Sequence, residues 1–416
     1  MRDFVKGFIS RQGNWVLGAH VFSKVMGFLT VLYVVRTHSE ADYGLVSYAL
    51  VVVNALVPFM GLGAFQAFLR FGSDRPGYWS KKQLYRYAYG RGMVASAGLA
   101  AVVLAAAPII CGDLPGAVPF MRILAFSLLS VLLMEYAKSY ARLMGMNRQA
   151  GQIEIAFAVC LLALTVMLTY FLGMQGYALA MVMAPLAAAV PYIVVFRLPG
   201  FSWGRETDSG AFWRYGIFVT LGALTGQLFY AVDVYMIGHL IPDAARDIAL
   251  YRVSAIIPLA GLVVPIAVAS ADFVKNSENK SNPQALRTYM RGYLRTFIPL
   301  TLVLTLVLLW VTPVLLSLFG SQYSQNPALM RIFVLGMAGA YLLRVPFGNL
   351  LSAVGRADWN TYHNILIVIL AIGLCALVVP AHGILGAAWV TAGLMWLSGV
   401  FSAMLLLLHL KKISAT

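Results

Sequence analysis

Four ionisable side chains lie inside long apolar stretches of this 416-residue sequence: Lys24, Glu135, Asp233 and Arg344. A charged group in the middle of a membrane span costs roughly 2.5–3.5 kcal/mol on insertion scales, so such groups face a cavity or a partner. The chemistry open to them is binding an anionic group, pairing with an opposite charge, or carrying a proton. We expect them to serve binding or coupling rather than catalysis, and we expect no metal and no cofactor.

Lys24 is the clearest of these residues. It lies about eleven residues into the first apolar span, or roughly 16 Å along a helix, close to the middle of a bilayer. His20 precedes it by one turn on the same helix face. Two interpretations of Lys24 stay open: a role in a cavity, or a side chain that snorkels to the interface, which is difficult from the middle of a span. His20 is typical of a hydrogen-bonded packing residue, and a coupling or salt-bridge role is its alternative.

The elements that carry these residues are membrane spans. The sequence is 61% hydrophobic and 11% charged, with a mean hydropathy of +0.82. Soluble globular proteins are about 45–50% apolar and about 25% charged, so this composition excludes a soluble globular protein. It also excludes a disordered chain and a nucleic-acid-binding protein. A span needs about 20 apolar residues. We predict about twelve helices, near 13–35, 44–70, 89–111, 117–140, 151–172, 174–196, 213–238, 248–274, 294–318, 327–352, 361–380 and 384–409.

The connectors between these spans are too short to fold as domains. No Lys follows a Gly, so the sequence has no phosphate-binding loop of the type that ATP-driven pumps use. The connectors on the outer side leave no room for a catalytic loop. We therefore expect a membrane protein that is not an enzyme.

Charge predicts the orientation. With the N-terminus inside, 24 of the 30 Lys and Arg residues fall on the inner side and five on the outer side, with Lys24 between them. An excess of Lys and Arg marks cytoplasmic loops, so both termini are expected in the cytoplasm. Much of the net charge of +15 therefore reflects topology.

The two halves of the chain resemble one another. Met121-Arg122-Ile123-Leu124 recurs as Met330-Arg331-Ile332-Phe333 at an offset of 209, and further pairs recur at 207 or 208: Leu56–Pro58 with Val263–Pro265, Gly176 with Gly383, and Arg148 with Arg356. The pattern predicts a bundle of six helices at 1–197, a cytoplasmic linker at 198–212 and a second six-helix bundle at 213–416. Because six is even, the bundles would be related by a pseudo-two-fold axis along the membrane normal, as in transporters that rock one bundle against the other.

Several short motifs resemble one family of transporters. They are Thr37–Gly44 after the first span, Met60–Ala64 with Leu69–Phe71 at the end of the second, Ala231–Asp233 in the seventh, and Gly355-Arg356 and His382–Ala388 near the C-terminus. Together they are similar to polysaccharide (Wzx-type) flippases of the multidrug/oligosaccharidyl-lipid/polysaccharide (MOP) exporter superfamily. The related peptidoglycan-precursor flippases carry two further spans, whereas this chain ends directly after its twelfth.

The resemblance implies a function and assigns roles. It implies a flippase that moves an undecaprenyl-diphosphate-linked oligosaccharide across the bacterial inner membrane by alternating access, in contact with membrane lipids and with polysaccharide polymerase machinery as a further candidate partner. A cation-coupled multidrug or small-molecule antiporter of the same superfamily is the alternative, and a scaffold subunit of a synthase complex is a third hypothesis. An antiporter for organic cations would need a cleft dominated by carboxylates, whereas Lys24 and Arg344 make this one mixed or basic.

In such a flippase, Lys24, Arg344 and Arg252 would form a cationic cleft, because the guanidinium fork matches phosphate oxygens. By the 209 offset, Arg344 is the repeat mate of Glu135, so an ion pair within each half is the competing interpretation. Arg252 could equally contact a lipid headgroup. Asp233 has three open roles: a salt bridge to Lys24 or Arg252, proton or sodium coupling, and acceptance of a sugar hydroxyl. Tyr230 and Tyr235 flank it and could stack on sugar rings.

Overall fold

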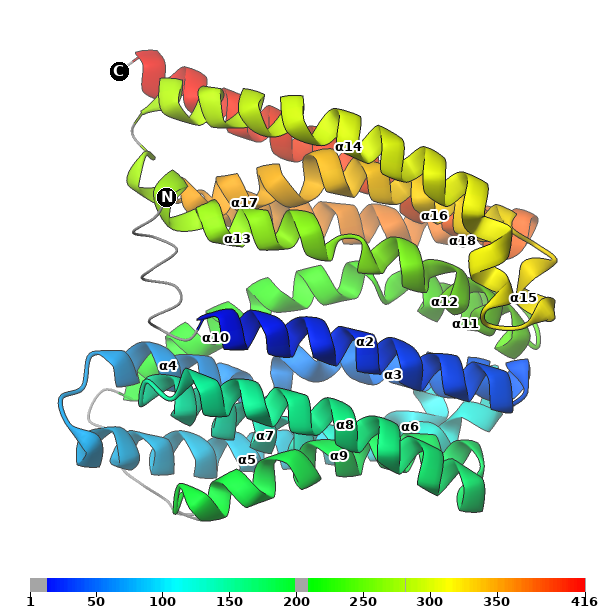
Figure 1. The fold of residues 1–416 in the computed structure, drawn as a ribbon, viewed down its shortest axis with the longest axis horizontal. Helices are drawn as coiled ribbons and strands as arrows, with labels where there is room; N and C mark the ends of the chain where they lie inside the picture. Colours follow the sequence, from blue (N-terminus) through cyan, green and yellow to red (C-terminus); the bar gives the residue numbers. More distant parts are fainter. Residues whose placement is uncertain (1–12, 199–208, 281, 416) are drawn as a thin grey trace. The chain divides into compact units, whose positions relative to one another are not determined.

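The computed structural model describes residues 13–198, 209–280 and 282–415, and all regular structure in these ranges is helical (Figure 1). Most of the predicted 198–212 linker and the basic residues before Gly13 lie outside the described residues. The described chain forms two compact units, with their boundary between Gln227 and Leu228 at the end of a helix. This boundary lies C-terminal to the predicted linker, because the preceding helix packs with the first unit.

The first unit contains most of the helices that the hydropathy predicts for spans one to seven. Their bounds are α2 Gly13–Thr37, α3 Glu40–Leu56, the 3₁₀ helix η1 Val57–Gly63, α4 Ala64–Ser73, α5 Tyr78–Cys111, η2 Pro115–Ala117, α6 Val118–Ala125, α7 Ser127–Leu143, α8 Asn147–Leu172, α9 Met174–Val195 and α10 Ser209–Phe229. Predicted span two is thus not one straight helix. Backbone at Gly61 and Gly63 has positive φ, which interrupts it between α3 and α4.

The second unit begins at Leu228, near the end of α10. Its helices are α11 Val232–Leu240, α12 Ala245–Ala260, α13 Val263–Glu278, α14 Pro283–Ser317, α15 Ser321–Ser324, α16 Ala328–Gly339, the π-helical turn η3 Ala340–Arg344, α17 Val345–Ala353 and α18 Ala357–Ala415.

The number of spans agrees with the hydropathy pattern. Ten helical segments of the described residues are long and apolar enough to cross a membrane, and the pair α10 and α11, bent by 51°, adds one more. One of the ten, residues 357–413, is counted once although it is interrupted at Gly383, where φ is 57° and ψ is −147°. At about 1.5 Å per residue this segment would reach about 85 Å, nearly three bilayer cores, so it provides two spans and the total reaches twelve.

The outward surface of the units is apolar, as a bilayer requires. Ile109, Tyr170 and Trp310 are each more than 80% exposed, and they lie on α5, α8 and α14. A water-soluble protein would bury side chains of this size. The exposed apolar rows therefore mark lipid-facing surfaces.

Local structure confirms the duplication and corrects its register. Gly145 and Gly355 both have positive φ, of 75° and 83°, and both end a span with the same hydrogen bonds. The N–H of Met146 reaches the carbonyl of Ala141, and that of Arg356 reaches Leu351, each at 2.8 Å. These equivalent atoms lie 210 residues apart. Arg356 is therefore the mate of Met146, and the pairing of Arg148 with Arg356 is wrong.

The two helical hairpins that follow repeat at the same offset. Gly173 and Gly383 have nearly identical backbone angles, with φ of 58° and 57°. Three residues later, a Cβ on Gly176 would lie 2.1 Å from the carbonyl oxygen of Leu168, and one on Gly386 would lie 3.1 Å from that of Val378. The true pairs are Gly173 with Gly383 and Gly176 with Gly386, so the pairing of Gly176 with Gly383 is wrong.

The change of offset from 209 to 210 has a structural cause. In the second half of the chain, the tetrapeptide at Met330 precedes η3 and the turn at Gly355 follows it, and the first half has no such π turn among its described residues. Within η3 the N–H of Val345 bonds to the carbonyl of Ala340, five residues back. A π turn holds one more residue than an α turn. Span ten therefore contains one residue more than span four, and Arg344 lies in the turn that accommodates it.

Candidate functional site

Arg344 lies at the end of the π turn η3, where α18 packs closely against it. Gly399 of α18 has no side chain, and a Cβ there would lie 2.5 Å from Cβ of Leu343. One turn earlier, Gly339 lies against the ring of Trp396, whose Nε1 donates to the carbonyl of Leu335 at 2.9 Å. π turns are frequent at functional sites. Close packing on α18 holds this one in place.

The guanidinium of Arg344 stacks on aromatic rings instead of pairing with a carboxylate. Its Cζ lies 3.8 Å from the centre of the Phe229 ring and 5.4 Å from that of Tyr230. Its Nη1 is buried and has no hydrogen-bond partner. Stacking of this kind contributes about 0.5–2 kcal/mol but leaves the donors of the fork unused. Among the described residues, Arg344 forms no ion pair of the kind that the sequence left open for this half of the chain.

A polar pocket of about 290 Å³ opens beside this guanidinium. Arg344 and Tyr230 line it together with Asn349, Asn360 and Asn364, and its remaining lining residues are Val345, Gly348, Ser352 and Ser402. The described lining therefore offers one cation, three amides, two hydroxyls and a phenol, and no carboxylate. Such a lining suits oxygen-rich ligands, because amides both donate to and accept from hydroxyls while the guanidinium fork donates to anionic oxygens.

Backbone breaks position the two main residues of the pocket. Tyr230 stands at the 51° bend between α10 and α11, and Arg344 stands in η3. Gly348 lies beside Asn360, whose Oδ1 would be in van der Waals contact, at 3.4 Å, with a Cβ at this position. Nδ2 of Asn360 donates to Oγ of Ser352 across 3.4 Å. The pocket thus lies where two interrupted spans and the start of α18 meet.

Asp233 lies just after the bend, in the first turn of α11, and is 7% exposed. Its Oδ2 accepts from the hydroxyl of Tyr251 at 2.6 Å and from that of Thr391 at 3.2 Å, and its Oδ1 accepts from the N–H of Val234 at 2.7 Å. Hydrogen bonds from three elements therefore hold the carboxylate. In the part of the chain that the structure describes, no ion pair joins Asp233 to Arg252, and Arg252 is partly buried.

Glu135 belongs to a buried ion cluster in the first unit. Nζ of Lys138 lies 2.8 Å from Oε1 of Glu135 and 2.5 Å from Oε2 of Glu154. Lys138 is only 5% exposed, so its charge is buried in α7 although the charge count places it on the inner side. Ser23 of α2 donates to Glu154 at 3.4 Å. The expected structural ion pair exists in the first half of the chain, and it ties α2, α7 and α8 together.

Lys24 and His20 are both exposed on α2. The opposite side of α2 packs on α8, where a Cβ on Gly151 would lie 3.5 Å from Cβ of Ala19. Exposure agrees with the cavity and snorkelling interpretations of Lys24 alike. For His20 the expected packing role is wrong, because its ring lies on the exposed face of the helix.

The two tyrosines that were predicted to stack on sugar rings, Tyr230 and Tyr235, lie in different surroundings. Tyr230 lines the pocket, but Tyr235 is 39% exposed and stacks on His239, with ring centres 4.2 Å apart. The residues that the sequence did not single out are Phe229 and the three asparagines of the pocket. Asn360 and Asn364 did carry a signal, since two amides one helical turn apart in an apolar span mark a polar face.

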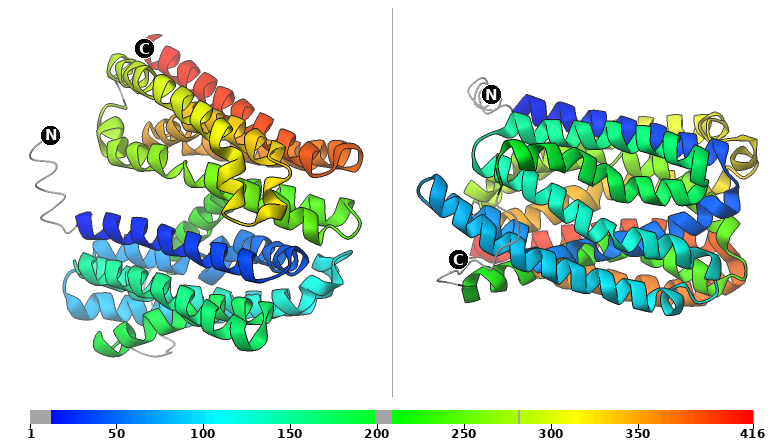
Figure 2. Two further views of the ribbon diagram at one scale, coloured as in Figure 1. Left: turned by 45° about the vertical axis from the view of Figure 1, so that its right-hand side comes forward. Right: turned by 90° about the horizontal axis from the view of Figure 1, so that it is seen from below.

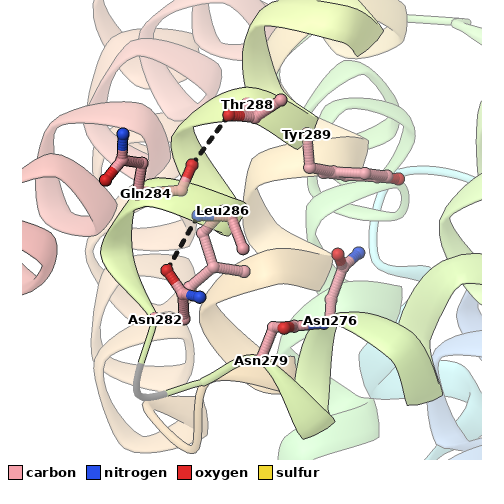
Figure 3. Close-up of a pocket in the computed structure, with 8 residues that line it drawn as sticks. Asn276, Asn279, Asn282, Gln284, Leu286, Thr288 and Tyr289 are labelled. Atoms are coloured by element: carbon pink, nitrogen blue, oxygen red, sulfur yellow. Dashed lines mark hydrogen bonds between the residues drawn. The ribbon is translucent and has the colours of Figure 1, made fainter.

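A second pocket, of about 570 Å³, lies between α13 and α14 (Figure 3). Asn276, Asn279 and Tyr289 line it, and the hydroxyl of Tyr289 donates to Asp272 at 3.0 Å. At its edge, Oδ1 of Asn282 accepts from the N–H of Ala285 at 3.0 Å and caps α14. The described lining residues of this pocket include amides but no cation, and its best-defined contacts fix the start of α14.

Known proteins identify the family of this chain. The family model described as polysaccharide biosynthesis protein matches residues 9–271, more than half of the chain. A search of curated proteins finds no match.

Solved structures match over nearly the whole chain. A multidrug resistance MATE family transporter of the MOP superfamily, inward-facing, aligns at a TM-score of 0.75 and 13% identity, covering 95% of this chain and 96% of that one. The lipid II flippase MurJ, inward closed, aligns at 0.77 and 14%, covering 96% and 90%. A MOP superfamily transporter from Pyrococcus furiosus aligns at 0.68 and 15%, covering 98% and 95%. At these identities the matches show the fold. The chain therefore belongs to the polysaccharide biosynthesis protein family and has the multi-pass membrane fold of MOP superfamily transporters, as its motifs indicated.

Proposed function

We propose that this protein is a flippase that moves an undecaprenyl-diphosphate-linked oligosaccharide across the bacterial inner membrane for surface polysaccharide assembly. The headgroup crosses by alternating access while the polyprenyl tail stays in lipid, and both termini lie in the cytoplasm. No covalent chemistry is involved. The family and the fold support a transporter of this superfamily, and the choice of substrate rests on the pocket at Arg344.

The observation that carries the proposal is a buried guanidinium with an unused donor beside a polar, carboxylate-free pocket. A diphosphate oxygen would fill the vacant hydrogen-bond position of Arg344, and a sugar hydroxyl would match Asn349, Asn360 or Asn364. The pocket is smaller than the roughly 300–1,000 Å³ that drug-sized ligands occupy. It therefore fits one phosphate or one sugar unit of a larger headgroup rather than a whole oligosaccharide.

Two features support movement of the second unit around this pocket. The bend at Tyr230 and the π turn before Val345 are both breaks in regular helix, and such positions absorb backbone changes in hinge motions. Both carry residues that line the pocket. A substrate contacting Tyr230 and Arg344 would favour the conformation that best aligns them, which is the differential contact that alternating access needs.

Asp233 is proposed as the coupling residue. Its carboxylate is buried, and one of its three hydrogen bonds comes from the first turn of its own helix α11. Protonation would remove the charge that attracts the hydroxyls of Tyr251 and Thr391, and so would loosen α11 from α12 and α18. A proton gradient could thereby act on the bend near Tyr230. The same acidic residue would also serve the alternative antiporter.

The test compares substitutions in a bacterial strain that lacks its own flippase for one surface glycan. Arg344→Ala and Lys24→Ala are measured for glycan display and for drug sensitivity, with Arg331→Ala as the matched control, because Arg331 is an exposed arginine on α16, four turns before Arg344. Loss of display with Arg344→Ala but not with the control supports the proposal. Normal glycan display together with increased drug sensitivity would replace it by the antiporter.

A further inference from the structure

Helix α14 is longer than a bilayer requires. Its 35 residues extend about 52 Å at about 1.5 Å per residue, against a hydrocarbon core of about 30 Å. Exposed apolar side chains begin at Ile298 and continue through Trp310 to Val314. The twenty residues from Ile298 to Ser317 match the core, so the first fifteen residues of α14 project beyond it, to the level of the lipid headgroups.

Basic residues occupy this projecting part at helical spacing. Arg287, Arg291 and Arg295 follow one another at intervals of four and are all exposed. The face behind them is fixed in place, because Leu286 and Met290 are buried in a core cluster with α17 and the end of α18. Asn282 caps the helix just before them (Figure 3). The arginines are therefore held on a rigid surface.

A groove of about 510 Å³ runs between this part of α14 and the end of α18. Figure 1 and Figure 2 show the start of α14 beside the last turns of α18, next to the C-terminus. Arg287, Arg291 and Lys411 line its charged part, and the apolar lining consists of Met290, Leu294, Met404, Leu407 and Leu408. Leu407 and Leu408 are about half exposed, on the side where α18 enters the bilayer.

The charges of the groove are uncompensated by the described part of the chain. Its lining contains three cations and no carboxylate, and none of the three forms an ion pair within 4.0 Å among the described residues. Basic pockets between transmembrane helices on the cytoplasmic side are sites for anionic headgroups. An apolar strip directly below them would accept the acyl chain attached to such a headgroup.

We propose that this groove binds one anionic glycerophospholipid of the cytoplasmic leaflet. The phosphate lies between the guanidinium forks of Arg287 and Arg291, Lys411 contributes a third positive charge, and an acyl chain lies along Leu407 and Leu408. The bound lipid joins α14 to α18 at the headgroup level and so stabilises the second unit. This site is separate from the pocket at Arg344 and does not depend on the transported substrate.

The test measures lipid binding by the full-length protein in detergent. Phosphatidylglycerol and phosphatidylcholine are titrated while bound lipid is counted by native mass spectrometry and the Tm is recorded. The variant Arg287→Gln/Arg291→Gln is compared with Arg86→Gln/Arg214→Gln, which removes two exposed arginines from the first unit and changes the net charge equally. Each lost cation is expected to weaken binding about fivefold, so the double variant should bind phosphatidylglycerol about 25-fold more weakly than the control.

Wild-type protein and control should gain Tm with phosphatidylglycerol but not with phosphatidylcholine, and the groove variant should lose this gain. Because the gain is measured within each protein, a lower starting Tm of the variant does not affect the comparison. Equal phosphatidylglycerol affinity of the two double variants would overturn the proposal. An equal gain of Tm with phosphatidylglycerol and with phosphatidylcholine would overturn it as well. So would the finding that the lipid lost from Arg287→Gln/Arg291→Gln is a polyprenyl phosphate.

Discussion

Replacing Arg344 by methionine separates a binding role from a structural one. The guanidinium has no carboxylate partner among the described residues, its Nη1 is buried without a hydrogen bond, and it stacks on Phe229 and Tyr230. A structural arginine would stabilise the fold through pairs that are absent here. Methionine keeps a long apolar stem against the two rings and removes the unsatisfied donor.

The expected magnitude follows from the bonds that the substrate would provide. A hydrogen bond to a charged group contributes about 1.5–3 kcal/mol, so two bonds from the fork to a diphosphate contribute at least about 3 kcal/mol. Their loss corresponds to roughly 150-fold weaker transport. Arg344→Lys keeps the charge but not the fork, so it should lose about one bond, or roughly tenfold. Stability should change little, because the lost stacking, about 0.5–2 kcal/mol, is offset by removal of a buried unsatisfied donor.

The assay is the rate at which glycan appears on the cell surface after induction of the flippase, measured by lectin binding and normalised to the amount of protein in the membrane. The Tm of the purified variants is measured in parallel. If the transport rate of Arg344→Met is within threefold of the wild-type rate, the binding role is refuted. A large fall in Tm that accompanies the loss of transport would show that Arg344 acts through the fold instead.

Three further substitutions test the buried polar contacts and the duplication. Tyr251→Phe removes the 2.6 Å bond to Asp233 and should lower the free energy of unfolding by about 1.5–3 kcal/mol, seen as a lower Tm, while an unchanged Tm would show that the carboxylate is already protonated or finds another donor. Lys138→Met leaves two buried carboxylates without their cation and should cost about 3–5 kcal/mol, and replacing both carboxylates by amides in the same variant should restore most of the Tm. Gly176→Ala places a Cβ 2.1 Å from a carbonyl oxygen and should reduce the amount of folded protein, whereas Gly98→Ala meets no atom within 4 Å and should be neutral. Equal yields of the two alanine variants would contradict the hairpin geometry.

Much of the fold could be predicted because its signals are local. Hydropathy within a window of about 20 residues locates each span, and the resemblance of the two halves predicts six helices in each. The register of the duplication could not be predicted in full. A match of short apolar peptides tolerates a shift of a few residues, and the extra residue of the π turn at Ala340–Arg344 has no signature in composition. The hydrogen bonds at Gly145 and Gly355 and the matching backbone angles at Gly173 and Gly383 define it.

The candidate site was predicted only in part, because it depends on which helices meet in space. Arg344 and Tyr230 were expected in a binding cleft, and they line one pocket. Glu135 was expected at the position equivalent to Arg344, with an ion pair as one of its open roles, and it does pair with Lys138. The three asparagines lie on α17 and α18, and their sequence positions give no direct indication that they meet Arg344.

The amino-acid sequence by itself determined that this chain is a polytopic membrane protein, where its spans lie, and which family its motifs resemble. These properties depend on the transfer of each residue from water to lipid, which is summed along the chain and needs no knowledge of neighbours in space. Tertiary structure decided which buried charges are satisfied. Among the described residues, Lys138 pairs with two carboxylates and Asp233 accepts three hydrogen bonds, whereas Arg344 has no carboxylate partner and its Nη1 has no hydrogen bond. The difference arises because electrostatic compensation depends on distances of a few ångströms between helices that are far apart in the sequence.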